Sequence, residues 1–342
     1  MKNVLLTTTA LVVLAGVASA EISWSAKTDI GYNDKINGGL FYDASVDLKG
    51  EFDLGDGYGA NITYGADLES NAGATTPWSG GPVIKRDAFP TIEITSPYGS
   101  LKGGDLADKG ASEYFYKDRS GMSLDVENHD SSTRFDYRAL AEFGDYGIAF
   151  GGEGDNAGGL DGMSVGAGAT FGNFTIGLGY DQKDTTHTGN NIGASVDTTF
   201  GAASIGLSYL GSGSDRSIGV AVGYDISSDL SAKAYYANNK VPTKVDAYGV
   251  SVAYKTGALG LDLYYDHTDA NVNKYGVDVS YEVMSELTAY VGYQSAATNG
   301  YYVGAKYTIN DNLSATVSYS DGNEISGPEF KDGVSVFLTA SF

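Results

Sequence analysis

Residues 275–293 read YGVDVSYEVMSELTAYVGY, two alternating segments on either side of a short turn at residues 282–286. Successive side chains of a β-strand point to opposite sides, so this alternation places the apolar residues of each segment on one face. That face is aliphatic in its middle and aromatic at both ends: it contains Tyr275, Val277, Val279 and Tyr281 before the turn, and Leu287, Ala289, Val291 and Tyr293 after it. The stretch predicts a β-hairpin with one apolar and one polar face.

The same unit repeats from Met163 onward, with short turns at residues 171–173, 200–202, 225–229, 255–258, 282–286 and 310–312. Aromatic residues stand at both ends of the apolar face: Phe171, Phe200, Tyr224, Tyr254, Tyr281 and Tyr307 before the turns, and Tyr180, Tyr209, Tyr236, Tyr265, Tyr293 and Tyr319 near the longer loops. This arrangement is typical of two aromatic girdles at the interfaces of a membrane, with the aliphatic band in lipid. A soluble β-sandwich also alternates, but it has no reason to repeat aromatic residues at both ends of the face.

The opposite face is polar and is therefore expected to face water; it carries Asp197, Lys233, Ser251, Asp262, Asp266, Lys274, Asp278, Thr288, Gln294, Lys306 and Thr316. The N-terminal third alternates in the same way. The composition of 48 Gly, 26 Tyr, 6 Pro and no Cys favours strands and tight turns over helical or disulfide-linked folds. The sequence therefore predicts an all-β fold, a transmembrane, antiparallel, up-and-down β-barrel of about 16–20 strands around a water-filled lumen.

The two ends of the chain carry export and assembly patterns. Lys2, an apolar run and a small-residue triplet that ends at Ala20 predict a signal peptide over residues 1–20, cleaved before Glu21, since the apolar run is too short to span a membrane as an anchor. One barrel domain is expected over residues 21–342. The final strand alternates and stops on Phe342, which resembles the assembly signal of outer-membrane proteins, although the last strand of a soluble sandwich would also alternate.

The formal net charge is −22, from 43 acidic and 21 basic residues. This excess disfavours nucleic acid as a partner and favours cations. A plainer interpretation is that many of the loop acids only keep an exported protein soluble. Between Gly103 and Ser132 the alternation stops, which predicts a functional loop far longer than an ordinary connection.

Taken in order, the start Glu21-Ile22-Ser23, the long loop after the fifth strand, the short Gly-rich turns and the terminal Phe342 resemble the general diffusion porins of α-proteobacteria, of the Rhodobacter-like type. The resemblance covers the entire mature chain. It implies an outer-membrane homotrimer of a Gram-negative bacterium, assembled by the barrel-assembly machinery among lipid and lipopolysaccharide. It also implies that the long loop folds into the barrel and narrows it, and that small hydrophilic solutes and ions diffuse through without catalysis.

Two features depart from that family. Its porins place basic wall residues opposite an acidic loop, whereas Asp43 and Asp47 occupy wall positions here, and the basic candidates are Lys27, Lys49, Arg134 and Arg138. We expect the loop acids Asp105, Asp108, Glu113 and Asp118 to face those basic residues in a cation-preferring eyelet; the alternative places the loop acids at the outer mouth. In addition, the alternating segments number about twenty, against sixteen or eighteen in the family.

Other function classes have weaker support. The histidines His129, His187 and His267 have no nucleophile motif beside them, so no enzyme is expected. No cofactor and no metal site are predicted, because no histidine pair or acidic loop has ligand spacing. An adhesive or structural barrel would need a small, plugged lumen. A substrate-specific porin stays open, since the inward aromatic residues Tyr235, Tyr264, Tyr290 and Tyr302 suggest a ladder inside the lumen.

Overall fold

The computed structural model describes residues 20–36, 39–69, 83–86, 89–104, 110–124, 136–154, 160–182, 189–296, 299–321 and 330–342. Those residues form strands, turns and loops, and no helix occurs among them. Within the same ranges, no helix is long and apolar enough to cross a membrane. The predicted signal peptide falls on residues 1–19, outside the described part, and on Ala20, which is the first residue of the first strand.

The first half of the wall consists of β1 (Ala20–Asn33), β2 (Leu40–Gly55), β3 (Tyr58–Glu69), β4 (Val83–Arg86), β5 (Thr91–Ser96), β6 (Gly99–Gly104), β7 (Asp136–Phe143), β8 (Tyr146–Gly154), β9 (Leu160–Phe171) and β10 (Phe174–Asp181). The second half consists of β11 (Asn191–Phe200), β12 (Ala203–Ser212), β13 (Asp215–Asp225), β14 (Leu230–Lys240), β15 (Ala247–Thr256), β16 (Leu259–His267), β17 (Asn273–Met284), β18 (Leu287–Ser295), β19 (Asn299–Asn310), β20 (Leu313–Asp321) and β21 (Gly333–Ser341). Each strand runs antiparallel to its neighbours.

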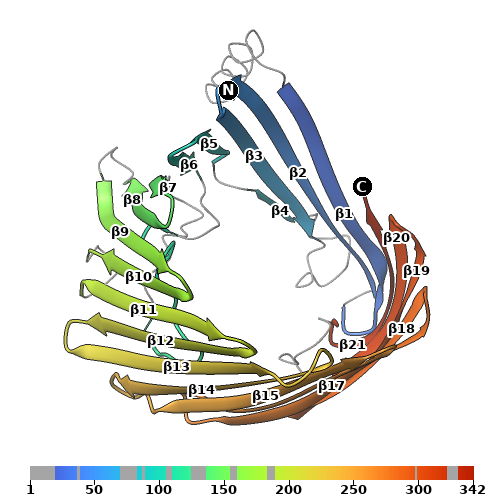
Figure 1. Ribbon diagram of the computed structural model, residues 1–342. Coiled ribbons are helices and arrows are strands. Elements are labelled where there is room, and N and C mark those ends of the chain that lie inside the picture. The colour runs from blue at the N-terminus through green and yellow to red at the C-terminus, as the bar shows by residue number, and fades with distance from the viewer. Residues whose placement is uncertain are drawn as a thin grey trace.

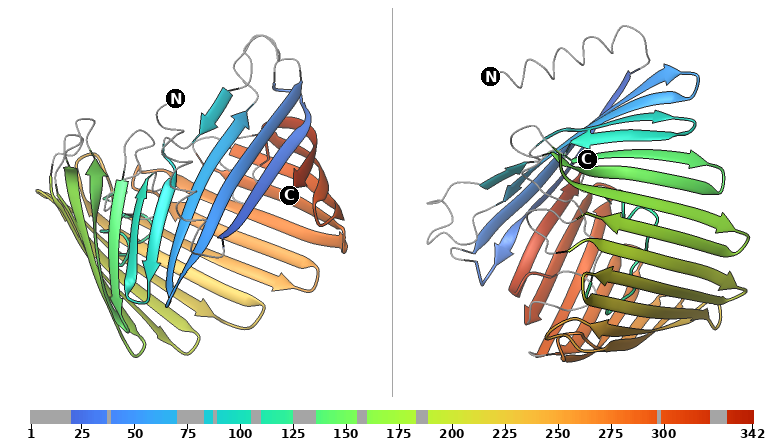
Figure 2. Two further views of the ribbon diagram at one scale, coloured as in Figure 1. Left: turned by 90° about the horizontal axis from the view of Figure 1, so that it is seen from above. Right: turned by 90° about the vertical axis from the view of Figure 1, so that its left-hand side faces the viewer.

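The sheet closes on itself because β1 pairs with both β2 and β21 (Figure 1). Both β4 and β5 pair with the same edge of β3, β4 with residues 66–69 and β5 with residues 59–63. They share one wall position, so the 21 strands make a barrel of 20. The strands are strongly tilted (Figure 2), as closure of a sheet into a barrel requires. The count lies at the upper end of the predicted range, and the predicted barrel fold is confirmed.

The wall is apolar outside and polar inside, as the alternation predicts. Outward residues in the middle of strands are highly exposed, for example Leu207 at 52% and Val291 at 51%. Serines on the other face are buried, among them Ser195, Ser208 and Ser217. Such a large exposed apolar surface suits a lipid environment and not water.

The aromatic girdles are also present. Near the short turns, Tyr146 packs edge-on against Phe171 with ring centroids 5.6 Å apart, and Phe174 packs against Phe200 at 5.9 Å. Near the opposite rim, the rings of Tyr301 and Tyr319 lie 5.6 Å apart. Glycines with positive φ make two of the tight turns, Gly172 and Gly201, both at φ 59°.

Candidate pore constriction

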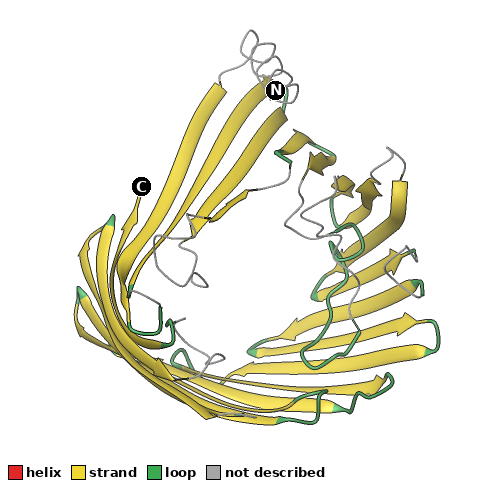
Figure 3. Ribbon diagram, turned by 180° about the vertical axis from the view of Figure 1, so that it is seen from behind, coloured by secondary structure: helices red, strands yellow, loops and turns green. Residues whose placement is uncertain are grey.

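Residues 110–124, the described part of the long loop between β6 and β7, lie inside the barrel. These residues run along the inner wall (Figure 3) and contact strands from β7 to β15. Ala111 lies against Gly151 of β8, Tyr116 against Gly193 of β11, and Gly121 against Ala247 of β15. The loop therefore follows the wall as a belt and narrows the lumen, which confirms the prediction that it folds inward.

Glycines on the inner face provide the seat for this belt. A side chain at Gly166 would collide with the Ala111 carbonyl, and one at Gly177 would collide with the Phe115 carbonyl. The Phe115 ring covers a further glycine, Gly168. Because these positions have no Cβ, the backbone of the loop approaches the backbone of the wall closely.

Polar contacts fix the loop at intervals along this seat. Ser112 Oγ donates a 2.7 Å hydrogen bond to Asp181 Oδ2 of β10. The Lys117 backbone bonds on both sides, its N–H donating to Ser195 Oγ at 3.1 Å and its carbonyl accepting from the Ser208 hydroxyl. Further along, Arg119 Nη2 donates to Asp197 Oδ1 at 2.8 Å, with side chains only 10% and 31% exposed.

Asn239 of β14 holds the far end of the described loop. Its amide nitrogen donates to the Gly121 carbonyl at 2.9 Å and to the Val245 carbonyl at 3.0 Å, while its Oδ1 accepts from the Ser123 N–H at 3.0 Å. Ser217 Oγ donates to the same Oδ1 at 2.8 Å. Asn239 is buried, with 5% of the residue exposed, and these hydrogen bonds join the loop to the wall in a fixed geometry.

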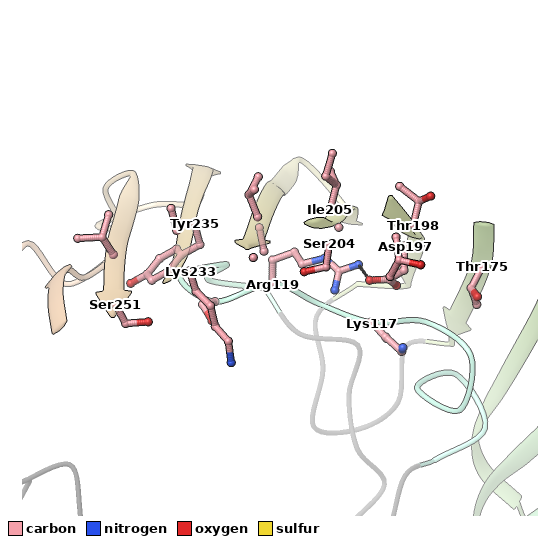
Figure 4. A pocket seen from close by; sticks show the side chains of 18 of the residues that line it. Lys117, Arg119, Thr175, Asp197, Thr198, Ser204, Ile205, Lys233, Tyr235 and Ser251 are labelled. Atoms are coloured by element: carbon pink, nitrogen blue, oxygen red, sulfur yellow. Dashed lines mark hydrogen bonds and ion pairs between the residues drawn. The ribbon is translucent and has the colours of Figure 1, made fainter. Parts of the chain in front are cut away.

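A hollow of about 830 Å³ opens between the loop and strands β10–β16. Figure 4 shows the Arg119–Asp197 pair at its centre, with the ammonium groups of Lys117 and Lys233 extending away from the strands on the same side. Tyr235 lies beside Lys233 and lines the same hollow. The lumen next to the loop is thus lined by charges of both signs and by tyrosine rings.

A family model described as Gram-negative porin matches residues 7–295 and 210–331 of the chain. The chain belongs to the Gram-negative porin family. A three-substitution variant of the Rhodopseudomonas blastica porin has a TM-score of 0.50 at 12% identity, covering 94% of this chain and 100% of its own. A second such variant has a TM-score of 0.49 at 13% identity, with coverages of 94% and 100%. A search of curated proteins found no match.

At such low identity the structural likeness shows the fold, an antiparallel porin barrel. The resemblance read from the sequence is confirmed, by the family match and by an α-proteobacterial porin with this fold. The protein is an outer-membrane porin of a Gram-negative bacterium, with a transmembrane β-barrel that forms a channel.

The predicted acids of the porin's loop are only partly within the described residues. Glu113 is half-buried in the belt, and Asp118 is exposed between Lys117 and Arg119. Asp105 and Asp108 lie outside the described part. The described loop segment, which the sequence analysis treated as acidic, therefore also carries two basic side chains, Lys117 and Arg119.

The predicted basic residues lie in two places. Lys27 of β1 and Lys49 of β2 pair with acids of their own strands, Lys27 Nζ with Asp29 at 3.9 Å and Lys49 Nζ with Glu51 at 2.5 Å. Arg138 of β7 is 5% exposed, and its guanidinium carbon lies 4.9 Å from the ring centroid of Tyr114 in the loop. Arg134 is outside the described residues. The structure thus joins Arg138 to the loop and places both lysines among acids on β1 and β2.

The acids of β1–β3 share one face of the wall. Asp29 pairs in register with Asp43, and Ser25 with Asp47, on the side opposite the exposed Trp24 and Leu48. Asp67 of β3 pairs in register with Ser45 of β2 on the same face. Lys331 Nζ forms an ion pair with Asp43 Oδ2 at 2.8 Å. This sector of the lumen carries more acids than bases among the described residues.

Several residues that build the constriction were missed in the sequence. The charge pattern did not predict a role for Arg119, Asn239 or the inner glycines of β8–β13. Their role depends on which strands the loop contacts, and the sequence does not show this. The glycines were visible as a repeated small residue on the polar face, which is a signal for close approach of another backbone. Outside the pore, His267 stacks on Tyr248 with ring centroids 5.0 Å apart, and no cluster of potential metal ligands occurs among the described residues.

Proposed function

We propose that this porin is a passive, cation-preferring pore for small hydrophilic solutes and ions. The observation that carries the proposal is the acidic sector of β1–β3, where Asp29, Asp43, Asp47, Glu51 and Asp67 lie on the inner face with Lys27 and Lys49. Acids lining a narrow lumen with a low-dielectric wall concentrate cations and disfavour anions. Across the lumen, the charges near the loop are more evenly balanced.

The proposal includes the eyelet expected from the sequence. In it, the loop acids Asp105, Asp108, Glu113 and Asp118 act together with Lys27, Lys49, Arg134, Arg138, Asp43 and Asp47 on the passing ion. Export by a signal peptide cleaved between Ala20 and Glu21, recognition of Phe342 by the barrel-assembly machinery, a homotrimer and contact with lipopolysaccharide belong to the same proposal. No enzymatic activity, cofactor or metal is part of it.

The test is single-channel recording of the refolded protein in a planar bilayer, with the reversal potential measured under a KCl gradient. Steady open steps with a cation-selective reversal potential are expected. Asp43→Asn with Asp47→Asn reduces the K⁺/Cl⁻ permeability ratio severalfold, while Asp311→Asn in the β19–β20 turn leaves it unchanged. A folded barrel that conducts no current overturns the pore. Anion selectivity overturns the cation preference and the acidic eyelet and leaves the pore itself standing.

A further inference from the structure

Two positively charged residues lie directly opposite each other on neighbouring strands of the wall. Arg216 of β13 pairs in register with Lys240, the last residue of β14. Residues opposed in this way have Cβ atoms about 4.5–5.5 Å apart, and like charges in such a pair are destabilising. The chain has a net charge of −22, so its composition does not account for two adjacent cations.

Both side chains lie on the outer face of the wall. Their neighbours in the two strands, Ser217 and Asn239, are buried on the inner face, where Ser217 Oγ donates to Asn239 Oδ1 at 2.8 Å. Successive side chains of a strand point to opposite sides, so Arg216 and Lys240 point away from the lumen. Both are exposed, as is Ile218, the next outward residue of β13.

The pair lies at the level of lipid headgroups. Because the strands alternate in direction, the β12–β13 and β14–β15 connections lie at the same rim as the long loop between β6 and β7, which is the extracellular rim in bacterial barrels. Tyr209 and Tyr236 belong to the aromatic girdle near this rim. Arg216 lies two residues beyond the row of Tyr209, about 7 Å along the strand, and Lys240 lies four residues beyond Tyr236. Girdle rings mark the membrane interface, so these charges face the headgroups of the outer leaflet.

No acid neutralises the pair. Within the described ranges, neither cation forms an ion pair with a carboxylate. The residue opposite Arg216 on β12 is Gly211. The Asp246 carboxylate already accepts from a tyrosine hydroxyl, a side-chain amide and a backbone N–H. Lys240 also lowers the pKa of Asp246, but less than the Tyr236 hydrogen bond, which is the main cause. This part of the rim therefore keeps an excess of positive charge.

An apolar surface continues from the pair toward the middle of the wall. Ile218 and Val222 of β13 and Leu207 of β12 are exposed on the outer face. Leu207 is opposite Val220, which lies between the two β13 residues on the same face. A ligand that matches both parts of this surface has an anionic head and aliphatic chains.

We propose that Arg216 and Lys240 together bind the phosphate group of an outer-leaflet lipid, whose acyl chains lie on the adjoining apolar wall. The Arg216 guanidinium can donate two parallel hydrogen bonds to phosphate oxygens, and the Lys240 ammonium supplies a compact second charge. A phosphate between the two cations replaces their repulsion by two attractive contacts. The inference deepens the proposed contact with lipopolysaccharide, because it names two residues and the chemical group that they bind.

The experiment titrates the detergent-solubilised wild-type porin with dioleoyl phosphatidic acid and counts bound lipids by native mass spectrometry. The dissociation constant is expected to rise roughly three- to tenfold in Arg216→Gln and in Lys240→Gln, because each variant loses one charge-assisted contact. Dioleoylglycerol has the same chains without the phosphate, and inorganic phosphate has no chains, so both are expected to bind more weakly. Lys306→Gln is the control, since it removes the same charge on the inner face, between Thr288 and Thr316, and should bind as the wild type.

Urea unfolding in lipid-free detergent gives a second readout, with a sign that a purely structural role does not produce. Removal of either cation relieves the repulsion, so Arg216→Gln and Lys240→Gln are expected to unfold at the same urea concentration as the wild type or at a higher one. Added phosphatidic acid is expected to raise the unfolding midpoint of the wild type more than that of either variant, because a ligand stabilises the state that binds it.

Equal affinity of the wild type and both variants for phosphatidic acid overturns the site. Equal binding of dioleoylglycerol overturns the role of the phosphate, and inorganic phosphate that binds as tightly as phosphatidic acid overturns the lipid as its source. Lower stability of both variants without lipid shows that the two residues support the fold itself and overturns the repulsive pair. Binding in detergent does not require an open lumen. A porin that carries KCl current without binding the lipid therefore leaves the proposed pore intact, and an electrically silent barrel overturns the pore alone.

Discussion

Arg119 in the belt donates a 2.8 Å hydrogen bond to Asp197 on β11, and this charged pair joins the constriction loop to the barrel wall. The guanidinium lies over Gly206 of β12, and Nη2 is also 3.5 Å from the Val196 carbonyl. The pair thus fixes the loop at the point where it borders the hollow with Lys117 and Lys233.

Removing one partner of this pair is expected to loosen the loop. Arg119→Met keeps the aliphatic stem but leaves Asp197 without its donor, so the free energy of unfolding falls by about 1–3 kcal/mol and open-channel current noise rises. Lys331→Met removes the more exposed ion pair with Asp43 and serves as the control, with a smaller loss. Urea titration and single-channel recording measure the two effects. Quiet channels in Arg119→Met would show that this pair does not hold the loop.

The glycine seat can be tested by adding one methyl group. Gly177→Ala brings a Cβ against the Phe115 carbonyl, so the loop backbone is pushed into the lumen and single-channel conductance falls. Gly50→Ala is the matched control, because the nearest atom to its new Cβ is the edge of the Phe52 ring at 3.1 Å, which can move. Unchanged conductance in Gly177→Ala would contradict the close approach.

The C-terminal residue closes the barrel through its backbone. The Phe342 N–H donates to the Ala26 carbonyl at 2.8 Å, and the Ala26 N–H donates to the Phe342 carbonyl at 3.1 Å. Phe342→Ala keeps both bonds and removes only an exposed ring, so refolding in detergent is expected to be normal while the amount assembled in cells falls severalfold. Phe171→Ala, a girdle residue, is the control. Normal assembly of Phe342→Ala in cells would argue against the ring as a recognition signal.

Acid is expected to weaken the anchor at Asn239. Asp246 Oδ1 accepts from the Asn239 N–H at 3.1 Å, and Asp246 Oδ2 accepts from the Tyr236 hydroxyl at 2.7 Å. The Tyr236 hydrogen bond is the main cause that holds the pKa of Asp246 below its ordinary value. A carboxyl with a lowered pKa stabilises the fold above its unfolded pKa of about 3.9, and this contribution is lost as the pH falls through the folded value.

Amide hydrogen exchange of residues 121–124, corrected for the intrinsic rate at each pH, measures this effect. Exchange is expected to be constant from neutral pH to about pH 5 and to accelerate below about pH 4. Asp246→Asn should exchange faster already at neutral pH and lose the acid step. An acid step of the same size in Asp246→Asn would assign it to another group.

Much of the fold could be predicted from local pattern. The alternation in residues 275–293 and its repeats predicted both faces of the wall, the girdles and the short turns, because side-chain direction in a strand follows from position alone. The number of strands was harder to predict. Residues 83–86 and 91–96 look like two strands, and only their pairing with the same edge of β3 makes them one wall position.

The site was less predictable, because its contacts join residues that are distant in the chain. The sequence alone determined an all-β barrel with a lipid-facing exterior, a polar lumen and a long loop after the fifth wall strand. The tertiary structure decided that the loop lies along the glycines of β8–β13, that Arg119 meets Asp197, and that Arg216 lies opposite Lys240. Alternation fixes the face of a side chain, whereas strand register and barrel closure fix its neighbours.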